Sequence, residues 1–293
     1  MSVEEVYREF EGHLVPVWGA REAAQIADWV IERVTGLDRL KRRTGRMLPV
    51  PEEQQDVLRD YLGQLLRHRP VQYVLGEAWF YRLKFYVDEN VLIPRPETEE
   101  LVSWVLEDLA APPAQKREGP RVLDVGTGSG CIPVALKSRY PEAEITAVDI
   151  SGPALAVARR NAAALGTPVQ FRQLDFLDRR GWKSLSGFDV VISNPPYIPP
   201  GEKDTLPSHV AGYEPAVALF ADGETPFVFY EALAAFGGEG LTAGGAIYAE
   251  IHEASATPVS EIFSRGGYEI VIKQDLYGRD RMIRARKPSA GTG

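Results

Sequence analysis

From Pro120 onward the sequence alternates between short apolar runs and longer alanine-rich or amphipathic stretches. This alternation is typical of a parallel sheet with helices on both faces. A closing antiparallel pair is expected around Gly278, formed by Tyr268 to Lys273 and Arg281 to Ala285. We therefore expect an α/β fold with a doubly wound, mainly parallel sheet. The runs that predict its parallel strands are Arg121 to Val125, Glu144 to Ile150, Val169 to Leu174, Asp189 to Ser193 and Ala246 to Ile251.

The first seventy-odd residues have helical periodicity instead. Between Ala20 and Thr35, apolar residues recur at three- and four-residue steps, and Gly36 follows as a stop signal. A second amphipathic helix is expected from Pro51, a favourable first-turn residue. A bundle of two or three such helices buries little apolar surface by itself, so we expect it to lean on a partner or on the rest of the chain.

A connector separates this bundle from the alternating region. Aromatic and β-branched residues on both sides of Asp88-Glu89-Asn90 predict a hairpin between Trp79 and Pro94. A helix is expected to begin at Pro96. A polar linker then runs from Ala111 to Gly119, and a Pro/Gly-rich tail covers 288–293.

Composition excludes several classes of protein. The chain has 293 residues, 44% hydrophobic and 25% charged, which suits one large domain and a smaller one. A net charge of -8 disfavours broad binding to a nucleic-acid backbone. The single cysteine, Cys131, rules out an internal disulfide, and the four histidines lack metal-ligand spacing, so no metal is expected. Without a long apolar run or a signal-peptide pattern, we expect a cytoplasmic protein and no membrane partner.

The first candidate site is a glycine loop, which follows the expected strand Val122 to Val125. Its five residues are Gly126, Thr127, Gly128, Ser129 and Gly130. Glycines there let the backbone turn sharply and approach a ligand. Asp124 precedes the turn, and a carboxylate suits a cationic amino-acid group better than a pyrophosphate. A tight turn without a ligand is the alternative.

Two further carboxylates follow the next strands. Asp149 lies a little over 20 residues past the glycines, where a carboxylate accepts hydrogen bonds from a ribose diol, and Ser151 is the better candidate for the helix cap. Asp175 and Phe176 follow another strand. They suit an exocyclic amine and an adenine face, and the alternative is a turn residue and a core aromatic.

The most specific motif is Asn194-Pro195-Pro196-Tyr197, directly after an apolar run. Two prolines end the hydrogen-bond ladder, so Asn194 is presented at the carboxyl edge of the sheet, where α/β proteins bind ligands. The Asn194 side-chain oxygen and the Pro195 carbonyl can accept both N–H groups of a planar amide or amino group, while Tyr197 packs on its plane. This predicts methylation of such a nitrogen.

With these motifs in this order, the chain resembles class I S-adenosylmethionine-dependent methyltransferases, whose sheet has seven strands with an antiparallel final strand. The Asn-Pro-Pro-Tyr form is shared by adenine-N6 DNA methyltransferases and protein glutamine-N5 methyltransferases. The segments Arg69 to Glu77, Phe80-Tyr81, Val91 to Glu99 and Asp275 to Arg281 resemble the release-factor glutamine methyltransferase (HemK/PrmC) family.

The resemblance implies methyl transfer from S-adenosylmethionine to the glutamine of the Gly-Gly-Gln motif in class I peptide chain release factors, in support of translation termination. The implied cofactor-binding residues are Asp124, Gly126 to Gly130, Asp149, Asp175, Phe176 and Asn194, with S-adenosylhomocysteine as product. The implied catalytic residues are Asn194, Pro195 and Tyr197, and the implied substrate-binding residues add Pro196, Arg95 and Glu97. A salt bridge at the helix start is the alternative for Arg95 and Glu97.

The expected domains are a helical substrate-docking domain over 1–76, a β-hairpin linker over 77–95, the methyltransferase domain over 96–288 and a tail over 289–293. The alternatives in function are a glutamine methyltransferase of a ribosomal protein, an adenine-N6 nucleic-acid methyltransferase, or a cofactor-binding module without catalysis. Direct nucleic-acid binding is not expected. The basic residues Lys41, Arg42, Arg43, Arg46, Arg67 and Arg69 suggest a docking face for the protein substrate, with an ordinary solvated face as the alternative.

Overall fold

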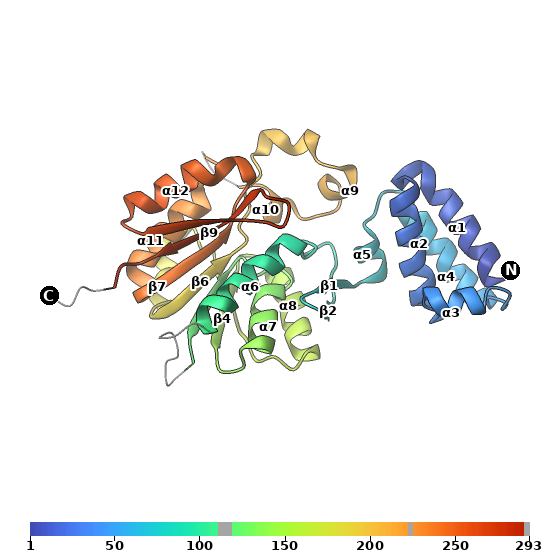
Figure 1. Ribbon diagram of the computed structural model, residues 1–293, viewed down its shortest axis with the longest axis horizontal. Coiled ribbons are helices and arrows are strands. Elements are labelled where there is room, and N and C mark those ends of the chain that lie inside the picture. The colour runs from blue at the N-terminus through green and yellow to red at the C-terminus, as the bar shows by residue number, and fades with distance from the viewer. Residues whose placement is uncertain (111–118, 222–224, 290–293) are drawn as a thin grey trace. The chain divides into compact units, whose positions relative to one another are not determined.

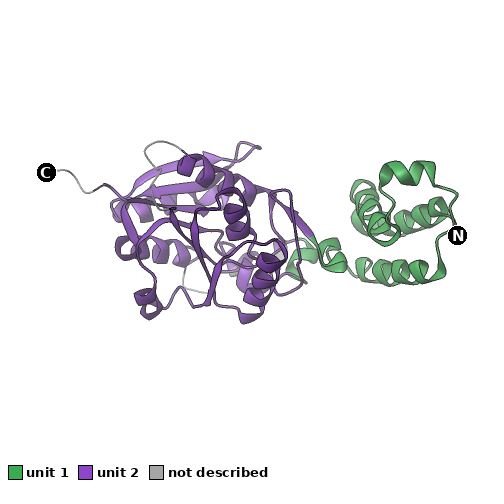
Figure 2. Ribbon diagram, turned by 90° about the horizontal axis from the view of Figure 1, so that it is seen from below, with its two compact units in different colours: residues 1–77, 207–213 green, residues 78–206, 214–293 purple. Residues whose placement is uncertain are grey.

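The computed structural model describes residues 1–110, 119–221 and 225–289 (Figure 1). Most of the expected polar linker, and the end of the expected tail, lie outside the described residues. The chain divides into two compact units (Figure 2). Unit 1 comprises Met1–Glu77 and Pro207–Tyr213, and unit 2 comprises Ala78–Leu206 and Glu214–Gly293. Among the described residues, no helix has both the length and the apolar character needed to cross a membrane.

Unit 1 is helical, as its periodicity predicts. Its helices are α1 (Val3–Trp18), α2 (Ala20–Thr35), α3 (Arg39–Thr44), α4 (Glu52–Leu65), α5 (Val71–Leu75) and α9 (Ser208–Ala211). Ser2 and Glu5 form a capping box at the start of α1, and Gly36 ends α2 in the left-handed conformation. The buried side chains of α1, α2 and α4 form one apolar core, which includes Phe10, Leu14 and Ile26.

A segment from late in the sequence completes unit 1. The Tyr213 hydroxyl donates a hydrogen bond of 2.7 Å to the Arg67 carbonyl. The His209 ring lies 5.4 Å from the Trp18 ring, centre to centre. Pro207–Tyr213 therefore belongs to the N-terminal helices in space, although nothing in its local sequence indicates this.

The expectation of a basic docking face is wrong for one of its members. Arg42 is 7% exposed, forms an ion pair with Asp28 and lies over the Tyr7 ring at 4.2 Å. A guanidinium that is buried, paired and stacked on an aromatic ring holds helices together and is not accessible to a partner. Arg43 and Arg46 are exposed.

Unit 2 contains a seven-stranded sheet in the order β5-β4-β3-β6-β7-β9-β8. The first four neighbouring pairs in this order are parallel, and β9 is antiparallel to both of its neighbours. This confirms the predicted doubly wound sheet with an antiparallel final strand. The strands are β3 (Arg121–Val125), β4 (Glu144–Asp149), β5 (Gln170–Gln173), β6 (Phe188–Ser193), β7 (Leu241–Glu250), β8 (Glu269–Gln274) and β9 (Asp280–Arg286).

Helices cover both faces of this sheet (Figure 1). One face packs on α6 (Pro96–Ala110), α7 (Cys131–Arg139) and α8 (Gly152–Ala164), the other on α11 (Val228–Gly240) and α12 (Ala256–Arg265). Alternate residues of β3 divide between them, since Val122 joins the first core while Leu123 and Val125 join the second. The short elements are η1 (Arg179–Ser184), η2 (Pro200–Thr205), α10 (Ala216–Leu219) and η3 (Glu253–Ser255).

The predicted hairpin exists, but its turn lies earlier than expected. Strands β1 (Ala78–Phe80) and β2 (Leu83–Phe85) pair antiparallel through Tyr81 and Arg82, not through Asp88-Glu89-Asn90. Phe80 and Phe85 are both fully buried and in edge contact at 6.1 Å, which fixes the strand register. Tyr81 and Arg82 accordingly adopt φ of 52° and 62°, a conformation usually left to glycine or asparagine. Asp88 instead accepts hydrogen bonds from Asn90 in a separate loop.

Candidate active site

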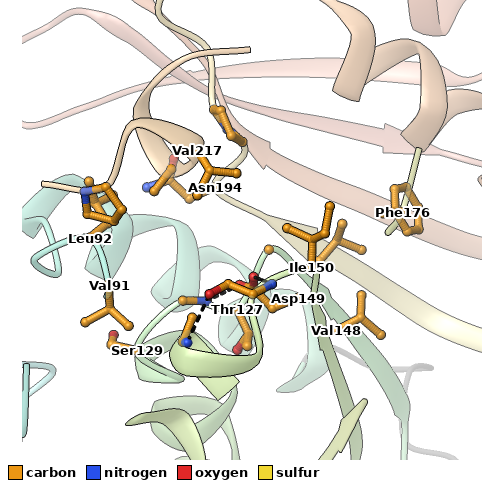
Figure 3. Close-up of a pocket in the computed structure, with 18 of the residues that line it drawn as sticks. Val91, Leu92, Thr127, Ser129, Val148, Asp149, Ile150, Phe176, Asn194 and Val217 are labelled. Atoms are coloured by element: carbon orange, nitrogen blue, oxygen red, sulfur yellow. Dashed lines mark hydrogen bonds between the residues drawn. The ribbon is translucent and has the colours of Figure 1, made fainter. Parts of the chain in front are cut away.

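A cavity of about 290 Å³ opens in unit 2, beyond the carboxyl ends of β3, β4 and β6 (Figure 3). Strand β3 lies between β4 and β6, so the connections leave it in opposite directions and create a crevice at this edge. Figure 3 shows Asn194 and Val217 on one side of the cavity and Thr127, Ser129 and Asp149 on the other. The apolar part of the wall includes Val91, Leu92, Val148, Ile150, Phe220 and Phe229.

The predicted glycine loop lines this cavity. Gly126, Gly128 and Gly130 have φ of 74°, 53° and 78°, a region that side chains with a Cβ rarely adopt. A Cβ on Gly130 would meet that of Ala158 at 3.0 Å, so this glycine also permits close packing of the loop on α8. The loop residues Gly126 to Ser129 face the cavity.

Asp149 holds the glycine loop in place while lining the cavity. Its Oδ2 accepts a hydrogen bond of 2.8 Å from the Gly128 amide, and its Oδ1 accepts one of 2.9 Å from the Ser151 amide. Burial raises the pKa of Asp149, and the two amides oppose this rise. Each carboxylate oxygen keeps a lone pair for a ligand hydroxyl. Ser151 caps α8 through Ala154, as expected.

Asp124 lies beneath the loop, fully buried, and does not line the cavity. Neither of its carboxylate oxygens has a well-formed hydrogen bond within the described chain, and the buried Thr127 hydroxyl likewise has none. Burial raises the pKa of Asp124 to about 7; the nearby Thr127 hydroxyl opposes this rise, and the Asp149 charge adds to it. A carboxyl group with a pKa near 7 can lose its proton when a cationic ligand binds close by.

Asp175 and Phe176 have mixed roles. Both line the cavity, but the Asp175 side chain also accepts a hydrogen bond from the Leu177 amide, as a turn residue does. Phe176 is 4% exposed and contacts the rings of Trp182 and Phe236 in the core. One edge of a core aromatic therefore serves as cavity wall, so the two interpretations of this residue are compatible.

The Asn-Pro-Pro-Tyr motif leaves β6 at the cavity. Asn194 and Pro196 line it, and Pro195 is buried. The Asn194 Nδ2 donates a hydrogen bond of 3.0 Å to the Thr98 hydroxyl, which donates one of 2.6 Å to Glu250 Oε2. The Tyr197 hydroxyl lies 3.4 Å from Glu250 Oε1. Burial, with the Glu250 charge, raises the pKa of Tyr197, so this phenol stays protonated.

Arg95 and Glu97 separate in the structure. Arg95 lines the cavity and pairs with the buried Glu214, Nη2 to Oε1, at 2.6 Å. Glu214 Oε2 also accepts a hydrogen bond from the Ile93 amide, so it ties the loop before α6 to the chain after 213. Glu97, in the first turn of α6, is not part of the cavity wall.

Three polar residues of this region were not predicted: Thr98, Glu214 and Glu250. A signal existed for Glu250, because it is an acidic residue at the carboxyl end of an expected strand, the position from which Asp149 was identified. Thr98 and Glu214 carry no such signal, since each acts through a partner about a hundred or more residues away.

The strand order, the antiparallel β9 and the glycine loop at the switch point together define a class I methyltransferase. Residues 105–235 match the family model of the methyltransferase small domain, and residues 19–76 match that of the PrmC N-terminal domain. The structure is similar to the hMettl16 catalytic domain in complex with MAT2A 3'UTR hairpin 6, with a TM-score of 0.55 and 16% identity, covering 72% of this chain and 77% of that one. This likeness concerns the fold alone.

Relatives by sequence are much closer. The release factor glutamine methyltransferase of Chlorobaculum tepidum is 40% identical, over 87% of each chain. That of Koribacter versatilis is 42% identical, over 75% of this chain and 76% of the relative. The chain belongs to the release factor glutamine methyltransferase family, which confirms the resemblance seen in its motifs.

Proposed function

We propose that this protein transfers a methyl group from S-adenosylmethionine to the side-chain amide nitrogen, N5, of the glutamine in the Gly-Gly-Gln motif of class I peptide chain release factors. The observation that carries the proposal is the place of Asn194. It stands across the cavity from the glycine loop, with its Nδ2 engaged by Thr98 and its Oδ1 available as an acceptor. Relatives over most of the chain are named for this reaction.

The residues around the cavity fit S-adenosylmethionine. The glycine loop offers a surface without Cβ atoms, and added Cβ atoms at Gly126 and Gly128 would meet nothing, so the space beside them is open. In the proposal the loop holds the methionine part, and the carboxylate of Asp124, beneath the loop, stabilises its ammonium group electrostatically. Asp149 accepts the ribose hydroxyls, and Asp175 and Phe176 face the adenine. When bound, the cofactor supplies an electrophilic methyl group.

The chain's own contribution to transfer is orientation and charge. An amide nitrogen is a poor nucleophile because its lone pair is delocalised into the carbonyl. Asn194 Oδ1 and the Pro195 carbonyl accept the two N–H groups of the glutamine, which aims the nitrogen at the methyl group. Positive charge develops on nitrogen as the new N–C bond forms and the S–C bond breaks, so these acceptors bind the transition state more strongly than the ground state. The nitrogen would then release one proton to solvent, with S-adenosylhomocysteine as the other product.

Two acceptors and an aromatic ring complete the proposed substrate site. Tyr197 packs beside the planar amide, and Pro195 and Pro196 stiffen the acceptors. Arg95 and Glu97 are proposed to border the entrance for the glycine-rich segment. The helical residues 1–76 are proposed to dock the protein substrate, with 77–95 as linker to the methyltransferase domain of 96–288. Because the substrate is a translation factor, we place the enzyme in the cytoplasm.

The test is transfer of radiolabelled methyl groups from S-adenosylmethionine to three purified acceptors: a class I release factor, the same factor with its Gly-Gly-Gln glutamine changed to alanine, and an adenine-containing DNA duplex. We expect label on the unchanged factor alone. Label on the alanine variant contradicts the assigned site, and label on DNA overturns the protein substrate. If none of the three is labelled, ribosomal proteins are tested as acceptors in the same way. Label on one of them would mean that the enzyme methylates a ribosomal protein and not a release factor.

A further inference from the structure

A buried hydrogen-bond chain runs behind the Asn-Pro-Pro-Tyr motif. It joins Asn194 after β6, Thr98 in the first turn of α6 and Glu250 at the end of β7. In sequence, Thr98 lies 96 residues from Asn194 and 152 residues from Glu250. Thr98 and Glu250 are each 2% exposed. A buried carboxylate costs free energy unless it accepts hydrogen bonds, and an apolar residue would fill the same space at lower cost. The chain of bonds therefore calls for a functional reason.

We propose that Thr98 and Glu250 are positioning residues that set the side-chain amide of Asn194 in one of its two orientations, with Oδ1 toward the glutamine. The inference rests on the proposed function, since it explains how the acceptor for the substrate N–H is selected. An asparagine amide is nearly symmetric in shape, so packing alone does not distinguish its oxygen from its nitrogen. The hydrogen bonds to the amide do distinguish them, because the oxygen accepts and the nitrogen donates.

The polarity originates at Glu250. An ionised carboxylate only accepts, so the single proton of the Thr98 hydroxyl is committed to Oε2 at 2.6 Å. The Thr98 oxygen can then only accept from its other neighbour, which requires the Nδ2 group of Asn194, at 3.0 Å. Oδ1 must face the opposite way. A flipped amide would turn N–H groups toward the N–H groups of the substrate and leave both sides without an acceptor.

The same carboxylate also faces the motif's tyrosine. Glu250 Oε1 lies 3.4 Å from the Tyr197 hydroxyl, and the Glu250 backbone carbonyl accepts a hydrogen bond of 2.9 Å from Tyr230. One ionised group thus orients Asn194 through Thr98 and holds Tyr197 directly. Glu250 does not line the cavity, and Thr98, which is 2% exposed, borders it beside Asn194.

The lock depends on the charge of Glu250. Once Glu250 is protonated, it can donate to Thr98, and Thr98 can donate to a flipped Asn194, so neither orientation is enforced. Burial raises the pKa of Glu250 to about 7, within the range in which enzymes work. Thr98, Arg281 and Tyr197 oppose the rise, and Glu97 adds to it. The titratable groups that face Glu250 are Glu97 from α6, Tyr197 after β6, Tyr230 from α11, and Arg281 from β9 with its partner Asp275.

Thr98→Val tests the relay, because valine keeps the shape of threonine and removes the hydroxyl. We expect kcat to fall by about 10- to 100-fold, as on loss of one preorganised polar contact. KM for the release factor and the affinity for S-adenosylmethionine stay within about twofold, since Thr98 is only 2% exposed and valine preserves the shape of its small contribution to the cavity wall. Thr98→Ser keeps the hydroxyl and is expected to restore kcat to within about threefold of the wild-type value.

The matched control is Thr242→Val. Thr242 at the start of β7 donates a hydrogen bond of 2.9 Å to Asp189 Oδ1 in β6, so it forms the same kind of hydroxyl–carboxylate pair at the other end of β7. We expect Thr242→Val to lower Tm without changing kcat. Equal losses of kcat in Thr98→Val and Thr242→Val would reduce Thr98 to a structural residue and overturn the proposal.

Glu250→Gln tests the origin of the polarity. In the wild type, kcat is expected to show an acid limb, falling as pH drops through the pKa of Glu250 and levelling off about 10- to 100-fold lower, as in Thr98→Val. Glutamine cannot titrate and can either accept from or donate to Thr98. We expect a lower kcat without this acid limb. An unchanged acid limb in Glu250→Gln contradicts the relay.

A readout independent of turnover keeps this inference separate from the proposed function. In ¹⁵N NMR spectra the Asn194 side-chain NH₂ pair, assigned by its absence in Asn194→Ala, is expected to exchange slowly with solvent in the wild type and in Thr98→Ser, and rapidly in Thr98→Val. If wild-type enzyme methylates no release factor but the NH₂ pair behaves this way, the function is wrong and the relay holds. If transfer occurs and Thr98→Val leaves both exchange and kcat unchanged, the relay is wrong.

Discussion

Two buried carboxyl groups near the active site have raised pKa values. Asp124 lies beneath the glycine loop and Glu250 behind the Asn-Pro-Pro-Tyr motif, and burial raises the pKa of each to about 7. Their environments differ in one respect. Glu250 accepts from Thr98, whereas neither oxygen of Asp124 has a well-formed hydrogen bond within the described chain. Asp124 is thus suited to balance the positive charge of a bound ligand. Glu250 is suited to orient the neighbouring Thr98.

Asn194→Ala should separate transfer from cofactor binding. Removing the proposed acceptor for the substrate N–H is expected to lower kcat by about 100- to 1,000-fold. The affinity for S-adenosylmethionine should change little, because the glycine loop and Asp149 hold that ligand from other strands. Single-turnover transfer and isothermal titration calorimetry check the two parts. Loss of cofactor affinity in this variant, with transfer at saturating cofactor intact, contradicts the role given to Asn194.

Asp124→Asn should change how stability depends on pH. The pKa of Asp124 rises on folding from 3.8 to about 7, so between these values the folded state keeps a proton that the unfolded chain has lost. Stability contributed by this group is therefore present at low pH and is lost as pH rises, at up to about 1.4 kcal/mol per pH unit. Asparagine does not titrate.

Thermal unfolding of the cofactor-free protein at pH 5 and pH 8 checks this expectation. The wild-type Tm should fall more between these two values than that of Asp124→Asn. Glu250 and Asp149 have raised pKa values too and remain in both proteins, so the difference between the slopes isolates Asp124. Parallel slopes would show that Asp124 is already ionised in the fold at pH 5.

At the level of elements, the glycine loop joins β3 to α7 under two separate constraints. Its glycines need a positive φ, and Gly130 also needs room against Ala158 of α8. The hairpin β1–β2 meets a similar demand with other residues. Tyr81 and Arg82 take positive φ because a two-residue hairpin turn requires it, and the turn is held by the buried Phe80 and Phe85 and by the Tyr81 hydroxyl, 3.2 Å from that of Ser103.

Gly130→Ala and Gly166→Ala should separate these two constraints. Both glycines have positive φ, 78° and 65°, so each alanine costs about 1–2 kcal/mol of stability. Only Gly130 has a neighbour at 3.0 Å; the space around Gly166, at the end of α8, is open. We expect Gly130→Ala to cost more and to weaken cofactor binding, whereas Gly166→Ala leaves it unchanged. Urea unfolding and calorimetry measure both, and equal costs would mean that α8 yields to the new methyl group.

At the level of the whole molecule, the chain passes between the two units more than once. It does so at Glu77–Ala78, at Leu206–Pro207 and at Tyr213–Glu214. The segment between the last two crossings, Pro207–Tyr213, follows the Asn-Pro-Pro-Tyr motif in sequence, and the next residue, Glu214, pairs with Arg95 at the cavity. This part of unit 1 is therefore joined at both of its ends to stretches of unit 2 that carry active-site residues.

Tyr213→Phe should loosen this segment. The variant removes the 2.7 Å hydrogen bond to the Arg67 carbonyl, worth about 1 kcal/mol. Backbone amides of 207–213 should then exchange with solvent about fivefold faster by mass spectrometry. Tyr277→Phe is the matched control, because Tyr277 is 81% exposed on the β8–β9 turn. Unchanged exchange in Tyr213→Phe would assign the segment's order to the Trp18–His209 contact instead.

The sequence by itself determined the features that depend on local spacing. Alternating apolar runs predicted β3 to β9, Gly36 marked the end of α2, and the glycine loop and Asn194 to Tyr197 marked the two halves of the candidate site. Periodicity, glycine and proline act through neighbouring backbone, so they are visible without knowing the fold.

Only the tertiary structure decided which distant side chains meet. It buried Arg42 against Asp28, placed the hairpin turn at Tyr81-Arg82, and carried Pro207–Tyr213 to the N-terminal helices. It also brought Thr98 and Glu250 behind Asn194. The free energy of such contacts depends on burial and on the polarity of a partner far away in the chain, and no local pattern of residues records either of these.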